Sequence, residues 1–209
     1  MNISRLRQAI PIVRRQPVLL SPQAITYLRT YPTLLVAAKR LRSGAPEAVL
    51  YQLTEIAYGW MPRVARIDPA HIRGARLALK KAGRMKAPHE DVEVIGSVAA
   101  CLHSVVGASK VLHFFSPRVF PIWDAKVARV WGDSEPTAKA LADPREYVQY
   151  ACQVHALIAR DAFRSFKGTF CEAYSARLEN LQIRRYRLTD VRTVEAAAFE
   201  LSDGEYQDM

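Results

Sequence analysis

The sequence has few cysteines, and their spacing argues against the common structural uses of thiols. Cys101, Cys152 and Cys171 are the only three, and no two of them lie near each other in the chain. Neither a C-x-x-C pair nor a Cys/His ligand spacing occurs, so no structural zinc site or iron–sulfur cluster is indicated. We therefore expect no metal and no cofactor, and we interpret the thiols as small buried groups in a reducing compartment.

Long apolar runs are also absent. No stretch approaches the roughly 18 consecutive apolar residues that would suggest a membrane span. Residues 1–15 are interrupted by arginines and contain neither an apolar run nor a small-residue cleavage site, so they do not resemble a secretory signal. We expect a cytoplasmic protein that acts away from membranes, and we expect it to be a monomer.

Signals for β-strands are nearly absent, whereas helical periodicity runs along almost the whole chain. Ser21-Pro22, Pro46 and Asp68-Pro69 are typical helix starts, because a capping side chain or a first-turn proline suits the unpaired backbone N–H groups there. The sequence therefore predicts an all-α fold. Further helices are predicted over residues 92–106, 109–115, 121–131, 144–162, 169–181 and 189–201, with fraying from Ser202 onward.

A polar stretch between Lys80 and Pro88 contains a glycine and ends at a proline, which favours a boundary between lobes. We predict an N-terminal helical lobe over residues 1–87 and a second lobe over residues 88–168. Residues 169–209 are predicted to form C-terminal helices and an acidic tail, and these helices are expected to be shared with the first lobe.

Basic residues outnumber acidic ones by 30 to 20, which gives a formal net charge of +10. This excess favours a polyanionic partner, nucleic acid first, and arginine suits bidentate contacts with phosphate. A solvated basic face without such a partner is the alternative. The densest basic runs are Arg63, Arg66, Arg73, Arg76, Lys80, Lys81, Arg84 and Lys86, and then Arg184, Arg185 and Arg187.

One short segment has the character of an active site. Asp124 stands among Ile122, Trp123, Val127 and Val130, just inside a predicted helix start. A carboxylate in such surroundings costs free energy unless it has a partner or a chemical use. Two interpretations stay open: Asp124 is catalytic, or it is a first-turn acid stabilised by the helix dipole.

Residues 120–130 resemble the segment around the catalytic aspartate of the helix-hairpin-helix DNA glycosylases, where the pattern reads F-P-I-x-D-x-x-V-x-R-V. The hairpin just upstream also resembles that family, although Ser104 and Val105 stand where its proline and first glycine are usual. Residues 109–117 look like bacterial proteins related to the oxoguanine glycosylases. The pattern is matched at Phe120, Pro121, Ile122, Asp124, Val127, Arg129 and Val130.

The resemblance implies compact helical lobes with a cleft between them. It also implies an enzyme that flips a damaged or modified base out of double-stranded DNA and cleaves its N-glycosidic bond. Asp124 would stabilise the positive charge that develops on the sugar. Lys110, one position beyond the family's hairpin lysine, would be a Schiff-base nucleophile with associated lyase activity, favoured by a helix start and partial burial. A lysine that only contacts phosphate or solvent is the alternative.

Two further groups of residues complete the predicted site. The first binds a DNA phosphate through backbone N–H groups, as helix starts do, and consists of Val106, Gly107, Ala108 and Ser109. The second forms a base pocket or a wedge, with core packing as the alternative, and consists of Trp123, Tyr58 and Trp60. His103 and His113 are interpreted as structural. Two other functions stay open: a non-catalytic helical DNA-binding protein, and a helical protein whose basic face binds another protein or RNA.

Overall fold

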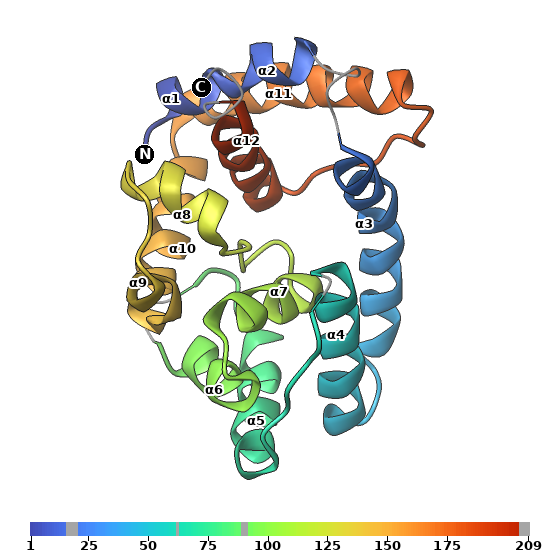
Figure 1. Cartoon of the computed structure of the whole chain (residues 1–209), viewed down its shortest axis with the longest axis vertical. Helices are drawn as coiled ribbons and strands as arrows, with labels where there is room; N and C mark the ends of the chain where they lie inside the picture. Colours follow the sequence, from blue (N-terminus) through green and yellow to red (C-terminus); the bar gives the residue numbers. More distant parts are fainter. Residues whose placement is uncertain (16–20, 62, 89–91, 205–209) are drawn as a thin grey trace.

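The computed structural model describes residues 1–15, 21–61, 63–88 and 92–204, and within these ranges every regular element is a helix (Figure 1). The prediction of an all-α fold is therefore confirmed. The helices are α1 (Ile3–Arg7), α2 (Ala9–Arg15), α3 (Pro22–Leu41), α4 (Pro46–Trp60), the 3₁₀ helix η1 (Pro69–His71), α5 (Ile72–Ala82), α6 (Glu93–Leu102), α7 (Val105–Phe115), α8 (Ala125–Gly132), α9 (Ala138–Ala142), α10 (Pro144–Ile158), α11 (Asp161–Asn180) and α12 (Asp190–Gly204).

The predicted helix starts at serine or aspartate followed by proline are confirmed. The Ser21 side chain accepts the N–H of Ala24 at 3.1 Å, and Pro22 follows as the first residue of α3. Asp68 caps in the same way, by accepting the N–H of Ala70 at 2.9 Å, but the helix that it opens is η1, which leads directly into α5. Each cap satisfies a backbone donor that the first turn leaves without a partner.

The predicted helix boundaries around the hairpin are wrong. The helix α6 ends at Leu102, and not near Val106, because His103 adopts the left-handed conformation with φ of 49°. Ser104 then caps α7, whose first residue is Val105, four residues before the predicted start. The glycine that was expected to break the helix, Gly107, lies inside α7.

The region around Asp124 also differs from the prediction. Residues 116–124 lie outside helices, so the predicted helix over 121–131 begins only at Ala125. Farther on, the predicted helix over 144–162 is divided between α10 and α11 near residue 160. Fraying at Ser202 is wrong as well, because α12 continues to Gly204; the remainder of the acidic tail, residues 205–209, lies outside the described residues.

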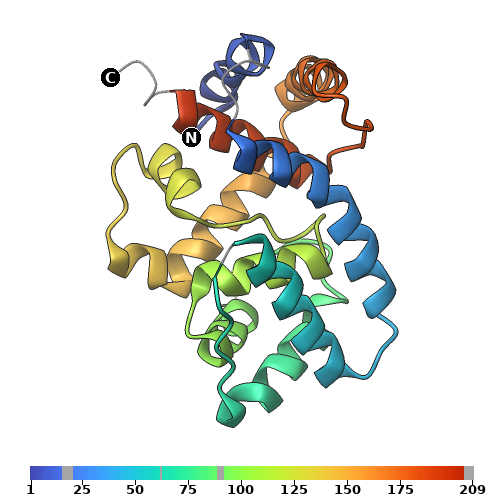
Figure 2. The same cartoon turned by 45° about the vertical axis from the view of Figure 1, so that its right-hand side comes forward.

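The helices form two packed groups (Figures 1 and 2). In one group, the hairpin helices α6 and α7 pack on α4 and α5, and α3 covers α4 and α7. In the other, α1 and α2 pack on α11 and α12; α12 also contacts α8, and both α11 and α12 contact α10. This grouping does not follow the predicted boundaries at residues 87 and 168, because the hairpin packs with the helices that precede it.

The hairpin helices α6 and α7 are composed mainly of apolar residues. Among the described residues no single helix is long and apolar enough to cross a bilayer, although α6 and α7 pass that test when they are taken together. The two are bent by 117° at residues 103–104. Most of their side chains lie in the core of the protein, where they pack against the neighbouring helices.

A buried ion pair ties the second group together. Arg177 on α11 is 2% exposed, and its Nη1 and Nη2 donate to the two carboxylate oxygens of Glu200 on α12 at 2.6 and 3.0 Å. Its Nε donates to the carbonyl oxygen of Val13 on α2 at 3.2 Å. One guanidinium therefore joins three helices, and the fork geometry that it needs is particular to arginine.

We expect Arg177→Ala to lower the free energy of unfolding by about 3–5 kcal/mol, because it leaves the Glu200 carboxylate in the interior without its cation. The matched control is Arg164→Ala, an exposed arginine on the same helix, for which a change within about 0.5 kcal/mol is expected. Urea denaturation followed by circular dichroism measures both. Similar losses in the two variants would contradict the assigned role of Arg177.

Candidate functional site

The candidate site is built on residues 117–124, which connect α7 to α8 and end at Asp124. This segment is buried along most of its length, with Phe120, Ile122 and Trp123 each less than 5% exposed. A buried stretch outside helices and sheets must find other partners for its backbone polar groups. Side chains from α7, α10 and α12 supply these partners.

The helix α10 and the start of α12 bind the carbonyl groups of the segment. The hydroxyl groups of Tyr147 and Tyr150 donate to the carbonyl oxygens of Pro121 and Ile122, both at 3.1 Å. Burial raises the pKa of both tyrosines well above 10, so their hydroxyl groups stay protonated as donors. Two longer-range contacts extend the pattern: His155 Nε2 to the Val119 oxygen at 2.9 Å, and Thr189 Oγ1 to the Pro117 oxygen at 2.9 Å.

The helices α7 and α12 hold the N–H groups just before Asp124. The hydroxyl of Ser109 accepts the N–H of Trp123 at 3.0 Å and donates to the carbonyl oxygen of Val106 at 2.8 Å. The carboxylate of Glu195 accepts the N–H of Ile122 at 3.2 Å and forms an ion pair with Arg192. The backbone immediately before Asp124 is thereby fixed from two sides.

A neutral histidine lies behind the segment. His113 is fully buried, and burial, together with the positive charge of Arg192, lowers its pKa from 6.5 to about 3. Its Nδ1 lies 2.8 Å from the carbonyl oxygen of Phe120, which assigns the proton to Nδ1, and its Nε2 then accepts the hydroxyl of Tyr31 at 2.8 Å. The guanidinium of Arg192 lies over the Tyr31 ring, 4.6 Å from its centre.

Asp124 is the N-cap residue of α8. It has the extended backbone conformation of a cap, and its Oδ1 accepts the N–H of Val127 at 3.0 Å. The prediction that placed it inside the first turn is therefore wrong by one position, although the favourable effect of a negative charge at a helix start applies here too. The side chain is half-buried.

Lys110 lies in the middle of α7, within electrostatic range of Asp124. Burial lowers the pKa of its amine from 10.5, Asp124 acts in the opposite direction, and the positive charges of Arg63 and Arg192 add to the lowering. The predicted contribution from a helix start is wrong, because α7 begins five residues earlier. Within the described part of the chain, the Lys110 amine forms no hydrogen bond or ion pair.

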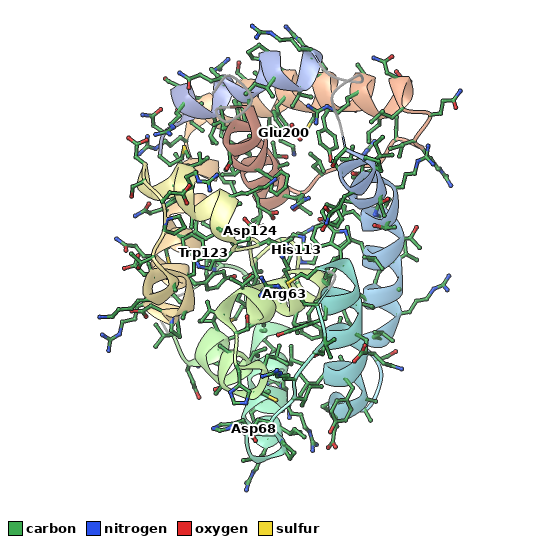
Figure 3. All side chains as sticks on the ribbon, in the orientation of Figure 1. Arg63, Asp68, His113, Trp123, Asp124 and Glu200 are labelled. Atoms are coloured by element: carbon green, nitrogen blue, oxygen red, sulfur yellow. The ribbon has the colours of Figure 1, made fainter. Side chains whose placement is uncertain are left out.

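The residues of the candidate site lie near the middle of the molecule. Figure 3 shows Asp124, Trp123, His113 and Arg63 close to the centre of the view, between the two groups of helices, whereas Asp68 and Glu200 lie toward opposite ends. The predicted pair Asp124 and Lys110 lie within electrostatic range of each other, and two arginines that the prediction had not assigned to the site, Arg63 and Arg192, act on the same amine.

Two of the backbone N–H groups that were predicted to bind a DNA phosphate already have partners inside the protein. The N–H of Gly107 donates to the Ser104 hydroxyl at 2.9 Å, and the N–H of Ala108 donates to the Ser104 carbonyl at 2.9 Å. Ser109 is fully buried, and only Val106 of this group is partly exposed. Gly107 has a different role: a Cβ there would lie 2.4 Å from the Tyr58 hydroxyl oxygen, so the glycine allows α4 to approach α7.

The predicted wedge residues lie mostly inside the protein. Tyr58 is 6% exposed, and Trp123 packs on Tyr150 with ring centres 5.0 Å apart. Trp60 is half-buried in a cluster with Tyr31 and Phe114. Tyr58 and Trp123 therefore pack in the core, as the alternative interpretation of these residues had it. The indole N–H groups of Trp60 and Trp123 are buried without a hydrogen-bond acceptor among the described residues.

Sequence reasoning missed the residues that hold the segment. Tyr147 with Tyr150, and Arg192 with Glu195, are each spaced three residues apart. This spacing puts both members of a pair on one helix face. It is the one feature of the sequence that could have indicated that the two side chains act on the same part of the protein. Tyr147, Tyr150 and Glu195 bind backbone atoms far away in sequence, which no local pattern identifies.

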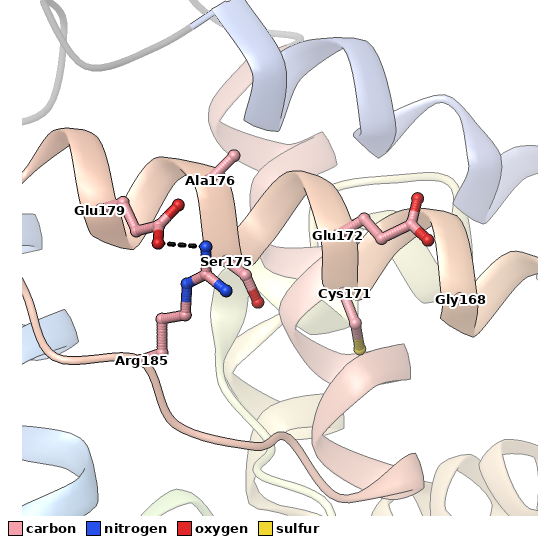
Figure 4. A pocket seen from close by; sticks show the side chains of 7 residues that line it. All are labelled: Gly168, Cys171, Glu172, Ser175, Ala176, Glu179 and Arg185. Atoms are coloured by element: carbon pink, nitrogen blue, oxygen red, sulfur yellow. Dashed lines mark ion pairs between the residues drawn. The ribbon is translucent and has the colours of Figure 1, made fainter.

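Two surface hollows lie away from this region. One, of about 360 Å³, is on the face of α11, where Arg185 forms an ion pair with Glu179 (Figure 4). The other, of about 440 Å³, lies between α5 and α6. Neither is lined by Asp124 or Lys110, and within the described ranges no group of three or more His, Cys, Asp or Glu residues could hold a metal ion.

Comparisons with protein-family models, with curated proteins and with solved structures found no match. The resemblance of residues 103–131 to the helix-hairpin-helix glycosylases therefore stays a prediction, and function is inferred from the residues and their geometry.

The buried neutral histidine predicts a pH dependence of stability. The pKa of His113 is about 3 in the folded protein and near 6.5 in the unfolded chain, so the unfolded state binds more protons at any pH between these values. Stability should fall as the pH drops below 6.5, and the loss from this one group reaches about 2 kcal/mol at pH 5. His155, whose pKa is also lowered by burial, adds to the loss.

The measurement is the free energy of unfolding in urea at pH 7 and at pH 5. His113→Gln should remove most of the difference between the two pH values, whatever its effect at pH 7. The control is His103→Asn, at an exposed left-handed position that asparagine tolerates; because its ring interacts, among the described residues, only with the partly exposed Asp68 carboxylate, 3.7 Å away, most of the difference should remain. An equal pH dependence in His113→Gln and in the parent protein would rule out His113 as its source.

Proposed function

We propose that the protein is a DNA glycosylase that flips a damaged or modified base out of double-stranded DNA and cleaves its N-glycosidic bond, with associated lyase activity. The observation that supports this most directly is the pair formed by Asp124 and Lys110. A carboxylate at a helix start lies within electrostatic range of a partly buried amine that has no ion-pair partner among the described residues and whose pKa is lowered.

Asp124 supplies the negative charge in this proposal. Breaking an N-glycosidic bond builds positive charge on the sugar, and a carboxylate that is already in place stabilises that charge without reorganisation. The cap hydrogen bond to Val127, and the side chains that hold residues 117–123, give Asp124 such a fixed position.

Lys110 supplies the nucleophile. Because its pKa is lowered, a larger share of the amine is neutral at a given pH, and only the neutral amine carries the lone pair that attacks C1′ of the nucleotide. The new bond joins Nζ to C1′ while the bond from C1′ to the base breaks, and the base leaves with the electron pair and takes up a proton. The nitrogen loses a proton to water, and the ring opens to a Schiff base as the C1′–O4′ bond breaks and O4′ takes up a proton. Loss of a C2′ proton to water then forms a C2′–C3′ double bond, and the C3′–O3′ bond breaks so that the 3′ phosphate leaves with the electron pair.

A non-catalytic helical DNA-binding protein is the second candidate. The observation that favours it is that Asp124 already has a structural use as the cap of α8, and that neither of the two surface hollows described above reaches it. In that case the net charge of +10 would serve DNA binding alone.

Asp124→Asn separates the two uses of this residue. Asparagine caps a helix about as well as aspartate does, so the fold and the affinity for DNA should be kept while the charge is lost. We expect the single-turnover rate of base excision to fall by about 10²-fold or more, measured on a panel of duplexes that each carry one damaged or modified base. Asp124→Ala, which removes cap and charge, should in addition lower the free energy of unfolding by about 1 kcal/mol.

An Asp124→Asn variant as active as the parent would contradict the catalytic role. If the parent binds duplex DNA but excises no base from the panel, the non-catalytic candidate is the correct one.

Lys110→Gln tests the covalent step. With a duplex that the parent protein cleaves, borohydride should trap a covalent protein–DNA adduct through the reduced Schiff base, and Lys110→Gln should abolish this adduct while base loss that depends on Asp124 partly survives. The control is Lys80→Gln, an exposed lysine on α5 that should trap normally. Base excision without any adduct in the parent would make water the nucleophile and Lys110 a phosphate contact.

A further inference from the structure

The connection between α4 and η1 carries an apolar side chain that is almost completely exposed. Val64 is 90% exposed, more than any other large apolar residue in the described chain; the next are Leu77 at 61% and Val36 at 54%. A single exposed valine is ordinary on a protein surface. Val64 is of interest because of the residues on either side of it.

Backbone hydrogen bonds join the segment to α4 at one end and to α6 at the other. The N–H of Arg63 donates to the carbonyl of Tyr58 on α4 at 3.3 Å. At the other end, the N–H of Asp68 donates to the carbonyl of Cys101 on α6 at 2.8 Å, and the Asp68 carboxylate binds His71 Nδ1 at 2.9 Å. Figures 1 and 2 both show this connection running alongside the hairpin helices α6 and α7.

Two exposed arginines flank Val64. Arg63 and Arg66 have no ion pair in the part of the chain that the structure describes, and Arg63 is close enough to the Lys110 amine and to Tyr58 to act on both electrostatically. Figure 3 places Arg63 near the centre of the molecule, in the same region as Asp124 and His113. The segment thus borders the candidate site.

The chemistry of this segment is complementary to a DNA duplex that has lost one base from its stack. An apolar side chain can occupy the space between base steps, and cations on either side of it can bind the phosphates. Arg63 and Arg66 are three residues apart, which is at most about 10 Å in an extended chain, or about three base-pair rises. A small residue, Ala65, leaves the approach to Val64 open.

We propose that the segment Arg63-Val64-Ala65-Arg66 enters the duplex: Val64 fills the space left in the base stack by the flipped nucleotide, and Arg63 and Arg66 bind the neighbouring phosphates. This inference rests on the proposed function and assigns the wedge to Val64, in place of Tyr58, whose ring is buried, and of Trp60, which is half-buried in an aromatic cluster.

The test uses the full-length protein and a duplex that needs no catalysis. The duplex carries a tetrahydrofuran abasic-site analogue with 2-aminopurine as the adjacent base, whose fluorescence rises when it is unstacked. Binding of the parent protein should raise the fluorescence, and Val64→Ala should at least halve this rise while DNA affinity stays within about threefold. The matched control is Val36→Ala, the same truncation at an exposed valine on α3, which should behave as the parent does.

The arginines are tested through the salt dependence of binding to the same duplex. Each of Arg63→Gln and Arg66→Gln should reduce the slope of log K against log salt by about 1, because each removes one phosphate contact. Arg14→Gln, on α2 in the other group of helices, should leave the slope unchanged.

The outcomes separate this inference from the proposed function. Equal fluorescence with Val64→Ala and Val36→Ala overturns the wedge, even where base excision is intact. Unstacking that depends on Val64, together with no excision of any base by the parent, supports the wedge and overturns the glycosylase. If the parent does not bind duplex DNA, both are overturned.

Discussion

The whole site depends on the need to satisfy the backbone of one buried segment that belongs to no helix. Residues 117–123 bring their carbonyl and N–H groups into the core, and each group left without a partner there would cost roughly 1–3 kcal/mol. Ser109, His113, Tyr147, Tyr150 and Glu195 supply these partners. They come from three helices, so the position of Asp124 is set by how the two groups of helices meet.

The same arrangement explains why the charge of Lys110 is not neutralised by a nearby ion-pair partner among the described residues. The Glu195 carboxylate accepts the N–H of Ile122 and forms an ion pair with Arg192, so it does not neutralise Lys110. Asp124 is the carboxylate that acts on Lys110, while burial and two arginines act in the opposite direction. The protein thus holds an amine whose charged form is disfavoured next to a carboxylate whose position is fixed, which is a combination that suits chemistry better than stability.

Much of the fold could be predicted from local signals, and the errors have identifiable causes. Caps followed by proline, as at Ser21 and Asp68, act within one turn and can be recognised in sequence. The end of α6 could not be predicted, because it depends on a left-handed histidine, His103, where glycine is the usual residue. Gly107 was taken as a helix breaker, whereas the structure uses it to admit Tyr58 from another helix.

The candidate site shows the same division between local and long-range information. Asp124 and Lys110 could be proposed from their neighbours in sequence, but the side chains that position them bind backbone atoms up to 73 residues away. Val64 escaped notice because exposure is a property of the assembled surface, and a valine between two arginines has no distinctive pattern. The burial of Tyr58 and Trp123 was equally invisible, since an aromatic residue packs in a core or on a ligand with the same chemistry.

The packing of α1 and α2 on α11 and α12 has a consequence for how the chain is made. The helices α1 and α2 find their partners only when α11 and α12 have been synthesised, so the apolar side chains of Ile3, Leu6, Ile10 and Val13 stay uncovered while the helices between them are made. The helices α3–α7, by contrast, mostly pack on neighbours that are close in sequence. Assembly would therefore begin around the hairpin, and the packing of α1 and α2 on α11 and α12 would follow as a later and slower step.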